Sequence, residues 1–340
     1  MMASTLPNTD AAASARAKPV AASIGARAIA RLASSRELTL SILILVLVGA
    51  MSAVYPDNFP TRANIAAVLL NAAQNGILVT GMMLLMIAGA FDLSIGSILA
   101  LTGVWAGVVV GWWNWPAPAG VAVGLVVGAT AGLINGLIVT RIGINALIAT
   151  LATMTIFRGL TYLTAGTGVT PIGDAFKLYG QSVFFGLQTP FWVMLVVVLG
   201  GAWAVARTRF FRQFYFIGGN PRAAKLSGIR VQRLTLIGFV IMGGLAGLAG
   251  VLGASRLNSA VVSAGIGVEL SVITATVLGG ASLKGGEGTV LGGVLGVLFI
   301  ALVQNAMIIN GIGIFWQPVI VGFVLLLAVS LDRFKRTHRS

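Results

Sequence analysis

Cysteine is absent from this sequence, and its single histidine, His338, lies near the C-terminus. Disulfides and thiolate chemistry are therefore excluded, and neither a histidine-based metal site nor a Ser-His-Asp triad is expected. The tripeptides Gly-Lys-Ser and Gly-Lys-Thr do not occur, so the chain has no P-loop for the phosphates of ATP. These absences argue against an enzyme and against a bound cofactor or metal in this chain.

Charge is also scarce. Only 9% of the 340 residues are charged, 57% are hydrophobic, and the mean hydropathy is +0.98. A soluble domain carries about 25% charged residues, so the sequence predicts an all-α polytopic membrane protein. The 45 glycines fit this class, because small residues let membrane helices approach closely.

Apolar runs define the expected helices, since a spanning helix needs about 20 predominantly apolar residues. We expect about ten transmembrane helices, within a range of about eight to eleven. The fifth and eighth segments are the least regular, and either could re-enter the membrane instead of crossing it. The segments are Leu38–Val54, Ile65–Ala88, Ser94–Val110, Val121–Thr140, Ala146–Leu163, Phe191–Ala206, Leu234–Leu252, Ser271–Leu283, Val290–Ile309 and Phe315–Leu331.

Positive charge orients these segments, because Lys and Arg stay preferentially in cytoplasmic loops. With both termini cytoplasmic, 18 of the 22 basic residues fall inside. The net charge of +14 therefore marks orientation and contact with anionic lipid, not nucleic-acid binding. The exceptions, outside or embedded, are Arg62, Arg158, Lys177 and Arg256.

The expected organisation has three parts. Residues 1–36 form a disordered cytoplasmic tail, with an Arg- and Ser-rich organellar transit peptide as the alternative. Residues 37–332 form the transmembrane domain, which includes a long cytoplasmic loop at 207–233. Residues 333–340 form a basic cytoplasmic tail.

An internal repeat is visible in two pairs of segments. FDLSIGSILALTG (Phe91–Gly103) is similar to VELSVITATVLGG (Val268–Gly280), and GLINGLIVTRIGI (Gly132–Ile144) aligns with ALVQNAMIINGIG (Ala301–Gly313). An offset of five segments predicts two inverted five-helix halves, as in transporters whose path lies at the repeat interface. The alternative is chance similarity among Gly- and Leu-rich helices.

Two acids, Asp92 and Glu269, each precede Leu-Ser and an apolar run. Acids beside membrane segments are often functional, which allows a gating or ion-coupling role. A carboxylate at a helix N-terminus is also favoured by the helix dipole, so structural capping is the other interpretation.

Neutral amides recur within the apolar segments. Asn71, Gln74 and Asn75 are three or four residues apart and share one helix face. Together with Asn135, Gln304 and Asn305 they indicate a polar lumen, because amides both donate and accept hydrogen bonds and so suit hydroxyl-rich solutes. Hydrogen bonding between helices is the alternative for any single one of them.

Glycine recurs every fourth residue at Gly124, Gly128, Gly132 and Gly136. Such a stripe lets two helices approach closely. The partner could be a second subunit or a helix of the same chain.

The basic loop FYFIGGNPRAAKLSGIRVQR (Phe214–Arg233) stands out in so apolar a chain. Asn220 and Pro221 can start a short helix, and Gly228 can end it. A short helix below a membrane bundle is a docking element, although an ordinary basic loop is also possible.

Three ordered motifs resemble a known family. IGGNPRAAKLSGI (Ile217–Ile229) is similar to the coupling loop of ATP-binding-cassette importer permeases. MIAGAFDLSIGSILALTG (Met86–Gly103) and GVELSVITATVLGGASLKGGEGTVLGGVLG (Gly267–Gly296) resemble the ribose-type sugar permeases. The resemblance covers about residues 40–332, nearly the whole apolar part of the chain.

The resemblance implies a permease subunit in the bacterial inner membrane that imports a monosaccharide. Its partners would be a sugar-type ATPase that binds ATP and Mg²⁺, a periplasmic sugar-binding protein and a second permease subunit, expected to be an identical copy. The residues carried over to the ATPase-coupling loop are Gly218, Gly219, Asn220, Ala223, Ala224 and Gly228. The family pattern has Glu where this chain has Arg222, so an electrostatic role at that position is not carried over.

Two other functions stay open from the residues alone. A stand-alone secondary transporter or facilitator would also have inverted repeats, but ionisable groups are nearly absent from the helix centres. An integral membrane enzyme would need a polar constellation that the sequence lacks. The particular sugar is not specified by these motifs.

Overall fold

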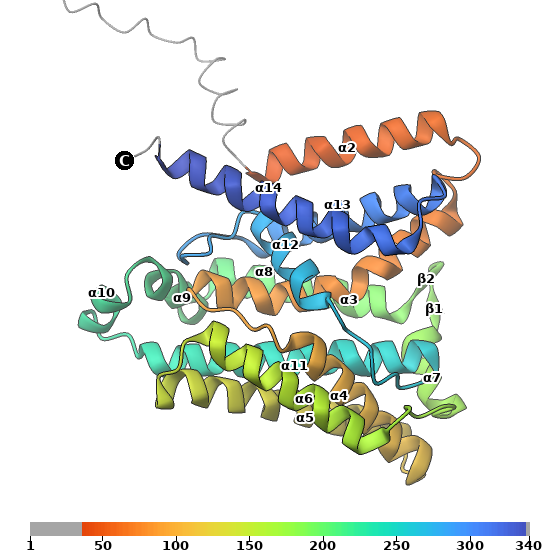
Figure 1. Cartoon of the computed structure of the whole chain (residues 1–340), viewed down its shortest axis with the longest axis horizontal. Helices are drawn as coiled ribbons and strands as arrows, with labels where there is room; N and C mark the ends of the chain where they lie inside the picture. The colour runs from red at the N-terminus through yellow and green to blue at the C-terminus, as the bar shows by residue number, and fades with distance from the viewer. Residues whose placement is uncertain (1–35, 338–340) are drawn as a thin grey trace, which may run out of the picture. The chain divides into compact units, whose positions relative to one another are not determined.

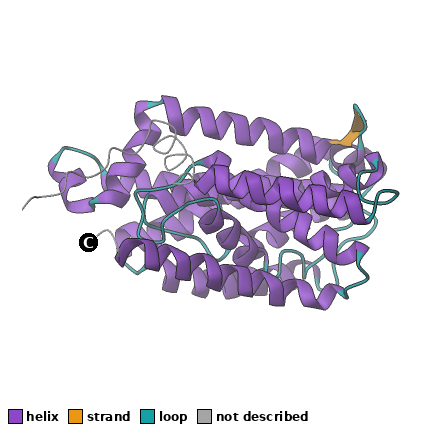
Figure 2. Ribbon diagram, turned by 90° about the horizontal axis from the view of Figure 1, so that it is seen from above, coloured by secondary structure: helices purple, strands orange, loops and turns teal. Residues whose placement is uncertain are grey.

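A computed structural model describes residues 36–337, and this part of the chain is built almost entirely of helices (Figures 1 and 2). Each predicted apolar segment overlaps a helix, although the eighth, Ser271–Leu283, extends past the end of its helix at Leu278. These helices are α2 (Arg36–Val54), α3 (Arg62–Ile87), α4 (Ile95–Gly107), α5 (Ala117–Leu137), α6 (Ala146–Ala165), α8 (Thr189–Arg207), α11 (Val231–Leu257), α12 (Val268–Leu278), α13 (Val290–Ile309) and α14 (Gln317–Thr337).

Eight helices in the described part are long and apolar enough to cross a membrane. Two of them gain a π-helical turn at their ends, Val108–Trp112 after α4 and Ile138–Ile142 after α5. The fifth expected segment, α6, has 20 residues and is long enough to span. The eighth, α12, has 11 residues and rises only ~16 Å, about half of a bilayer core.

Five short helices and strands lie outside the expected segments. Helix α7 (Asp174–Gln181) is followed by a hairpin of β1 (Val183–Phe184) and β2 (Leu187–Gln188), in which Val183 pairs with Gln188. The expected cytoplasmic loop at 207–233 contains two helices, α9 (Arg209–Gly219) and α10 (Pro221–Leu226). A 3₁₀ turn, Ile314–Trp316, precedes α14.

The core of the bundle lies around α3 and α4. The second half of α3, from Gly76 to Ile87, is buried without interruption, and α4 is buried over almost its whole length. A helix that is apolar and buried all round belongs to the centre of a bundle. Helix α3 contacts both α8 and α13, which are labelled in Figure 1.

The glycine stripe of α5 faces α11 of the same chain. A Cβ on Gly128 would collide with the carbonyl oxygen of Gly243, and a Cβ on Gly132 would collide with that of Phe239. The two backbones therefore touch, which only glycine permits. Of the two partners considered for this stripe, the structure gives the helix of the same chain.

The boundaries between the expected tails and the transmembrane domain both shift. Helix α14 continues to Thr337, whereas a tail was expected from residue 333. At the other end, Arg36 is the first residue of α2. The remaining residues of the expected N-terminal tail, and His338, lie outside the described residues.

The contact between α5 and α11 makes a prediction about stability. Gly128→Ala forces a methyl group against a carbonyl oxygen, and we expect a loss of about 1–3 kcal/mol in the free energy of unfolding. Gly159 of α6 has nothing within 4 Å of its ideal Cβ, so Gly159→Ala is the matched control and should be neutral or slightly stabilising. Thermal unfolding in detergent measures both. Equal stability of the two variants would contradict the packing described here.

Candidate functional site

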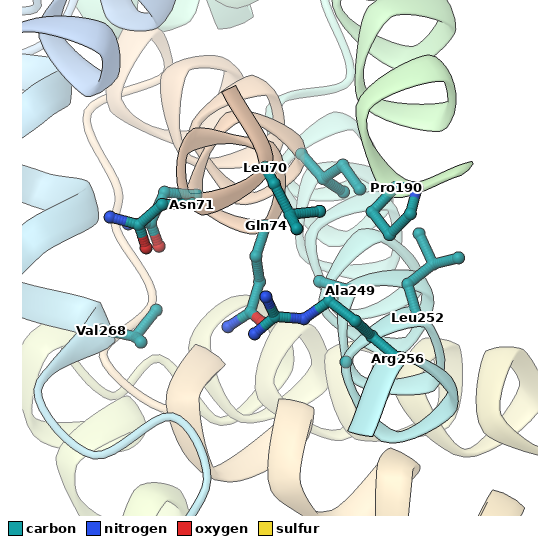
Figure 3. A pocket seen from close by; sticks show the side chains of 11 residues that line it. Leu70, Asn71, Gln74, Pro190, Ala249, Leu252, Arg256 and Val268 are labelled. Atoms are coloured by element: carbon teal, nitrogen blue, oxygen red, sulfur yellow. The ribbon is translucent and has the colours of Figure 1, made fainter. Parts of the chain in front are cut away.

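A cavity of about 260 Å³ opens between α3, α8, α11 and α12 (Figure 3). Its wall is polar and apolar in about equal measure, and the polar side chains come from α3 and α11. Ligand pockets combine an apolar lining with a few polar groups. The lining residues are Leu70, Asn71, Gln74, Asn75, Ile77, Pro190, Ala249, Leu252, Gly253, Arg256 and Val268.

The three amides of the predicted helix face all line this cavity. Asn71 donates to Oε1 of Gln304 on α13 at 3.3 Å. Gln74 and Asn75 make no side-chain hydrogen bond within the described part of the chain, so their donors and acceptors are available to a solute. Figure 3 shows Gln74 and the guanidinium of Arg256 reaching toward the same space.

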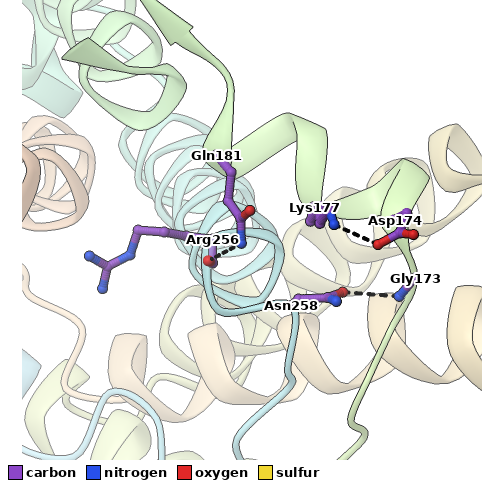
Figure 4. A network of polar contacts seen from close by, with 6 residues as sticks. All are labelled: Gly173, Asp174, Lys177, Gln181, Arg256 and Asn258. Carbon is purple, nitrogen blue, oxygen red and sulfur yellow. Dashed lines mark hydrogen bonds and ion pairs between the residues drawn. The ribbon is translucent and has the colours of Figure 1, made fainter. Parts of the chain in front are cut away.

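Helix α7 fixes the last turn of α11, from which Arg256 projects (Figure 4). Gln181 donates to the backbone carbonyl of Arg256 at 2.9 Å, and Ser255 donates to the carbonyl of Phe176 at 2.6 Å. One residue beyond α11, the Oδ1 of Asn258 accepts from the backbone N–H of Gly173 at 3.0 Å. The position of Arg256 at the cavity therefore depends on a short helix that the hydropathy pattern does not reveal.

The other predicted path amides lie elsewhere. Asn305 and Asn64 donate to each other at 3.1 and 2.7 Å, which ties α13 to the start of α3. Asn135 is fully buried and does not line the cavity. In this conformation both make the helix-to-helix hydrogen bonds of the alternative interpretation.

Asn135 belongs to a buried cluster with Asp92 and Ser94. The Oδ1 of Asp92 accepts from the backbone N–H of Ser94 at 2.8 Å and from its hydroxyl at 2.6 Å. The Oδ2 accepts from Nδ2 of Asn135 at 3.0 Å. Asp92 thus pins the start of α4 to α5, and its geometry is that of a structural residue at a helix N-terminus.

Arg158 of α6 joins the first repeat motif to the loop that precedes the second. Its guanidinium donates to the carbonyls of Val262 and Ala264 at 2.6 and 2.9 Å, and to that of Gly96 at 3.2 Å. Gly96 lies in the first turn of α4, and the other two carbonyls lie in the loop before α12. Glu269, in the first turn of α12, attracts the charge of Arg158.

The opposite end of the bundle carries the expected docking helix. The side chain of Asn220 accepts from the N–H groups of Arg222 and Ala223 at 3.1 and 3.0 Å, and Pro221 occupies the first turn of α10. Gly228 ends this turn with a left-handed φ of +83°. Ala224 is buried, whereas Leu226 is 90% exposed at the tip.

Glycines connect α9 to the bundle. A Cβ on Gly218 would collide with the carbonyl of Ile87 at the end of α3 and with the backbone of Gly286. The hydroxyl of Tyr215 donates to the carbonyl of Gly288 at 2.7 Å. The region around α10 is therefore packed, backbone to backbone, against α3 and the loop between α12 and α13.

Residues 36–337 contain no group of three His, Asp or Glu side chains that could hold a metal ion. Sequence reasoning gave no role to Arg256 and Arg158, although an arginine in or beside an apolar segment is itself a signal. Arg158 bonds to backbone carbonyls, and the side chain of Arg256 lines the cavity. A sequence motif encodes neither arrangement.

Arg158 supports a prediction about the loop before α12. Arg158→Gln removes a charged donor from carbonyls that have little access to water, and we expect a loss of at least about 1.5–3 kcal/mol in stability. Limited proteolysis of residues 258–267 should become faster, and thermal unfolding should occur at lower temperature. Arg141→Gln is the control, because Arg141 is exposed. A loop equally protected in both variants would contradict the role of Arg158.

Comparisons with known proteins identify the family of this chain. The family described as branched-chain amino acid transport system / permease component matches residues 64–329. The ribose import permease of Escherichia coli K12 is 38% identical over 300 residues, which cover 87% of this chain and 93% of that protein. The ribose import permease of Bacillus subtilis is 40% identical over 301 residues, covering 87% and 92%.

An L-arabinose ABC transporter permease of Azospirillum brasilense is 37% identical over 299 residues, covering 88% of each chain. No solved structure matches the chain. The resemblance that the three sequence motifs indicated is confirmed over most of the chain, and it favours a transport subunit over an enzyme or a stand-alone transporter. The chain belongs to this family of permease components and is a multi-pass membrane permease of the ATP-binding-cassette sugar importer type.

Proposed function

We propose that this permease moves a monosaccharide into the bacterial cytoplasm by alternating access, driven by a separate ATPase. The observation that carries the proposal is the pairing of a polar cavity at one end of the bundle with an exposed helix, α10, at the other. The relatives named for ribose and L-arabinose support a sugar as the solute.

The cavity chemistry fits a sugar. Gln74 and Asn75 can each donate to and accept from hydroxyl groups, and the guanidinium of Arg256 adds further donors. No carboxylate lines the cavity, which fits a neutral solute better than a cation. We assign Asn71, Gln74 and Asn75 to the path, with Gln304 as the residue that orients Asn71.

The permeation path follows the interface of two inverted five-helix halves, with both termini in the cytoplasm of a bacterium. The contact of Arg158 with Gly96 and with the loop before α12 supports this arrangement, because it ties the first repeat motif to the segment that leads into the second. A second copy of the chain would complete the path in a homodimer.

The ATPase docks on α10, and ATP and Mg²⁺ bind to that partner. The exposed Leu226 supplies an apolar anchor, and Gly218 and Gly219 carry the motion to α3. Since Arg222 is exposed at the position where the family pattern has Glu, recognition rests on the shape of α10 and not on a carboxylate. A periplasmic sugar-binding protein delivers the solute at the cavity end.

Removing a cavity amide tests the path. Gln74→Ala should lower the initial rate of sugar uptake about two- to tenfold at saturating loaded binding protein, because one hydrogen bond to the solute is lost. Asn305→Ala serves as the comparison, since Asn305 bonds to Asn64 and not to the cavity. Its rate per folded transporter should stay unchanged. An unchanged rate in Gln74→Ala would remove Gln74 from the path.

Substitution at the tip of α10 tests the docking. Leu226→Asp should weaken ATPase binding by about 2 kcal/mol or more, or roughly thirtyfold in Kd, as expected for an interface anchor. Leu226 is 90% exposed, so the substitution costs little in folding. Leu178→Asp, at an exposed leucine of α7, is the matched control. Copurification from detergent measures both, and equal recovery of the ATPase would contradict docking on α10.

A further inference from the structure

A second groove lies where α8 ends and α9 begins. It has a volume of about 640 Å³ and takes its wall from both helices. The chain leaves α8 at Arg207, turns at Thr208 and enters α9 at Arg209. The lining residues are Val205, Ala206, Arg209, Arg212, Tyr215 and Phe216.

The groove is positively charged. Arg209 and Arg212 are three residues apart on one face of α9, and both are exposed. Neither guanidinium has an ion pair within the described part of the chain. Glu37, whose charge acts on Tyr215, accepts a hydrogen bond from the hydroxyl of Thr289. Two unpaired guanidiniums beside a hollow match the geometry of a phosphate, which arginine binds through paired N–H groups.

Tyr215 lines the groove with its ring, and its hydroxyl is bonded to the backbone. Burial, and after it the charge of Glu37, raises the pKa of Tyr215, so its hydroxyl remains protonated and keeps its hydrogen bond to Gly288. The two arginines therefore provide the ligand-binding charge, and the tyrosine ring provides a wall.

Two exposed aromatic side chains lie on the helices that form the groove. Trp203 of α8 is 65% exposed one turn before Arg207, and Phe216 of α9 is 63% exposed. Phe214, on the other face of α9, is fully buried and holds the helix to the bundle. Exposed tryptophan next to a basic amphipathic helix is typical of the interface between lipid tails and headgroups.

We propose that the groove between α8 and α9 binds the phosphate of an anionic phospholipid headgroup. The lipid source is favoured over a soluble phosphate because the exposed ring of Phe216 lines the groove together with the two arginines, and Trp203 is exposed in the last turns of α8. It is favoured over an acidic protein because α9 follows a membrane helix after one residue. Bound there, the lipid would brace α9 and, through it, the connection from α10 to α3.

Lipid binding to the full-length purified chain tests the proposal. Native mass spectrometry would measure the affinity for phosphatidylglycerol and for phosphatidylcholine of the same chain length. The double variant Arg209→Gln/Arg212→Gln should weaken phosphatidylglycerol binding roughly ten- to thirtyfold, since each arginine near a lipid surface contributes about 1 kcal/mol. Phosphatidylcholine binding should be weak and unchanged.

The matched control is Arg222→Gln/Arg230→Gln, which removes the same charge from exposed positions outside the groove. It should bind phosphatidylglycerol like the parent chain. An equal loss of phosphatidylglycerol affinity in both double variants would mean that only the net charge matters, and would contradict a specific site in the groove. Displacement of the lipid by millimolar inorganic phosphate would overturn the proposal in favour of a free anion. If Arg209→Gln/Arg212→Gln instead lost ATPase binding while its lipid affinity stayed intact, the proposal would be overturned in favour of an acidic protein.

Discussion

The structure depends on one constraint, that a backbone polar group in the hydrocarbon core must find its partner within the protein. Helices meet this constraint internally, but the chain leaves helix at residues 88–94 and at 258–267. At the first break Asp92 accepts the N–H of Ser94. At the second, Arg158 donates to the carbonyls of Val262 and Ala264. Asp92 and Arg158 thus satisfy backbone groups in the two irregular segments that lead into α4 and α12.

Close backbone contacts connect the two ends of the permease. Glycines bring backbone against backbone where α5 meets α11 and where Gly218 meets the end of α3. Contacts of this kind leave no flexible side chain between the elements, so under the proposed docking a displacement of α10 would be passed on to α3. Helix α3 carries Ile87 at that end and Gln74 at the cavity. One helix therefore connects the proposed docking surface with the cavity.

The sequence was sufficient for features set by local chemistry. Hydropathy located the ten apolar helices, and Asn220, Pro221 and Gly228 located α10, because caps and turns are determined by neighbouring residues. It was insufficient where a side chain's partner is distant. Helix α7 and the role of Arg256 depend on contacts with the end of α11. Asn135 and Gln74 both carry an amide, and only their surroundings in the fold distinguish the buried residue from the cavity residue. The amides share one chemistry, so the sequence alone could not separate cavity residues from helix ties.

The central claim is that this chain forms the path for the sugar, and that a separate ATPase supplies the energy. Sugar uptake into sealed vesicles tests it most directly, with the purified chain alone and with a sugar-type ATPase and loaded binding protein. We predict accumulation against a gradient only when the ATPase and ATP are present, and none with the chain alone. Concentrative uptake by the chain alone, supported by an ion gradient, would contradict the account.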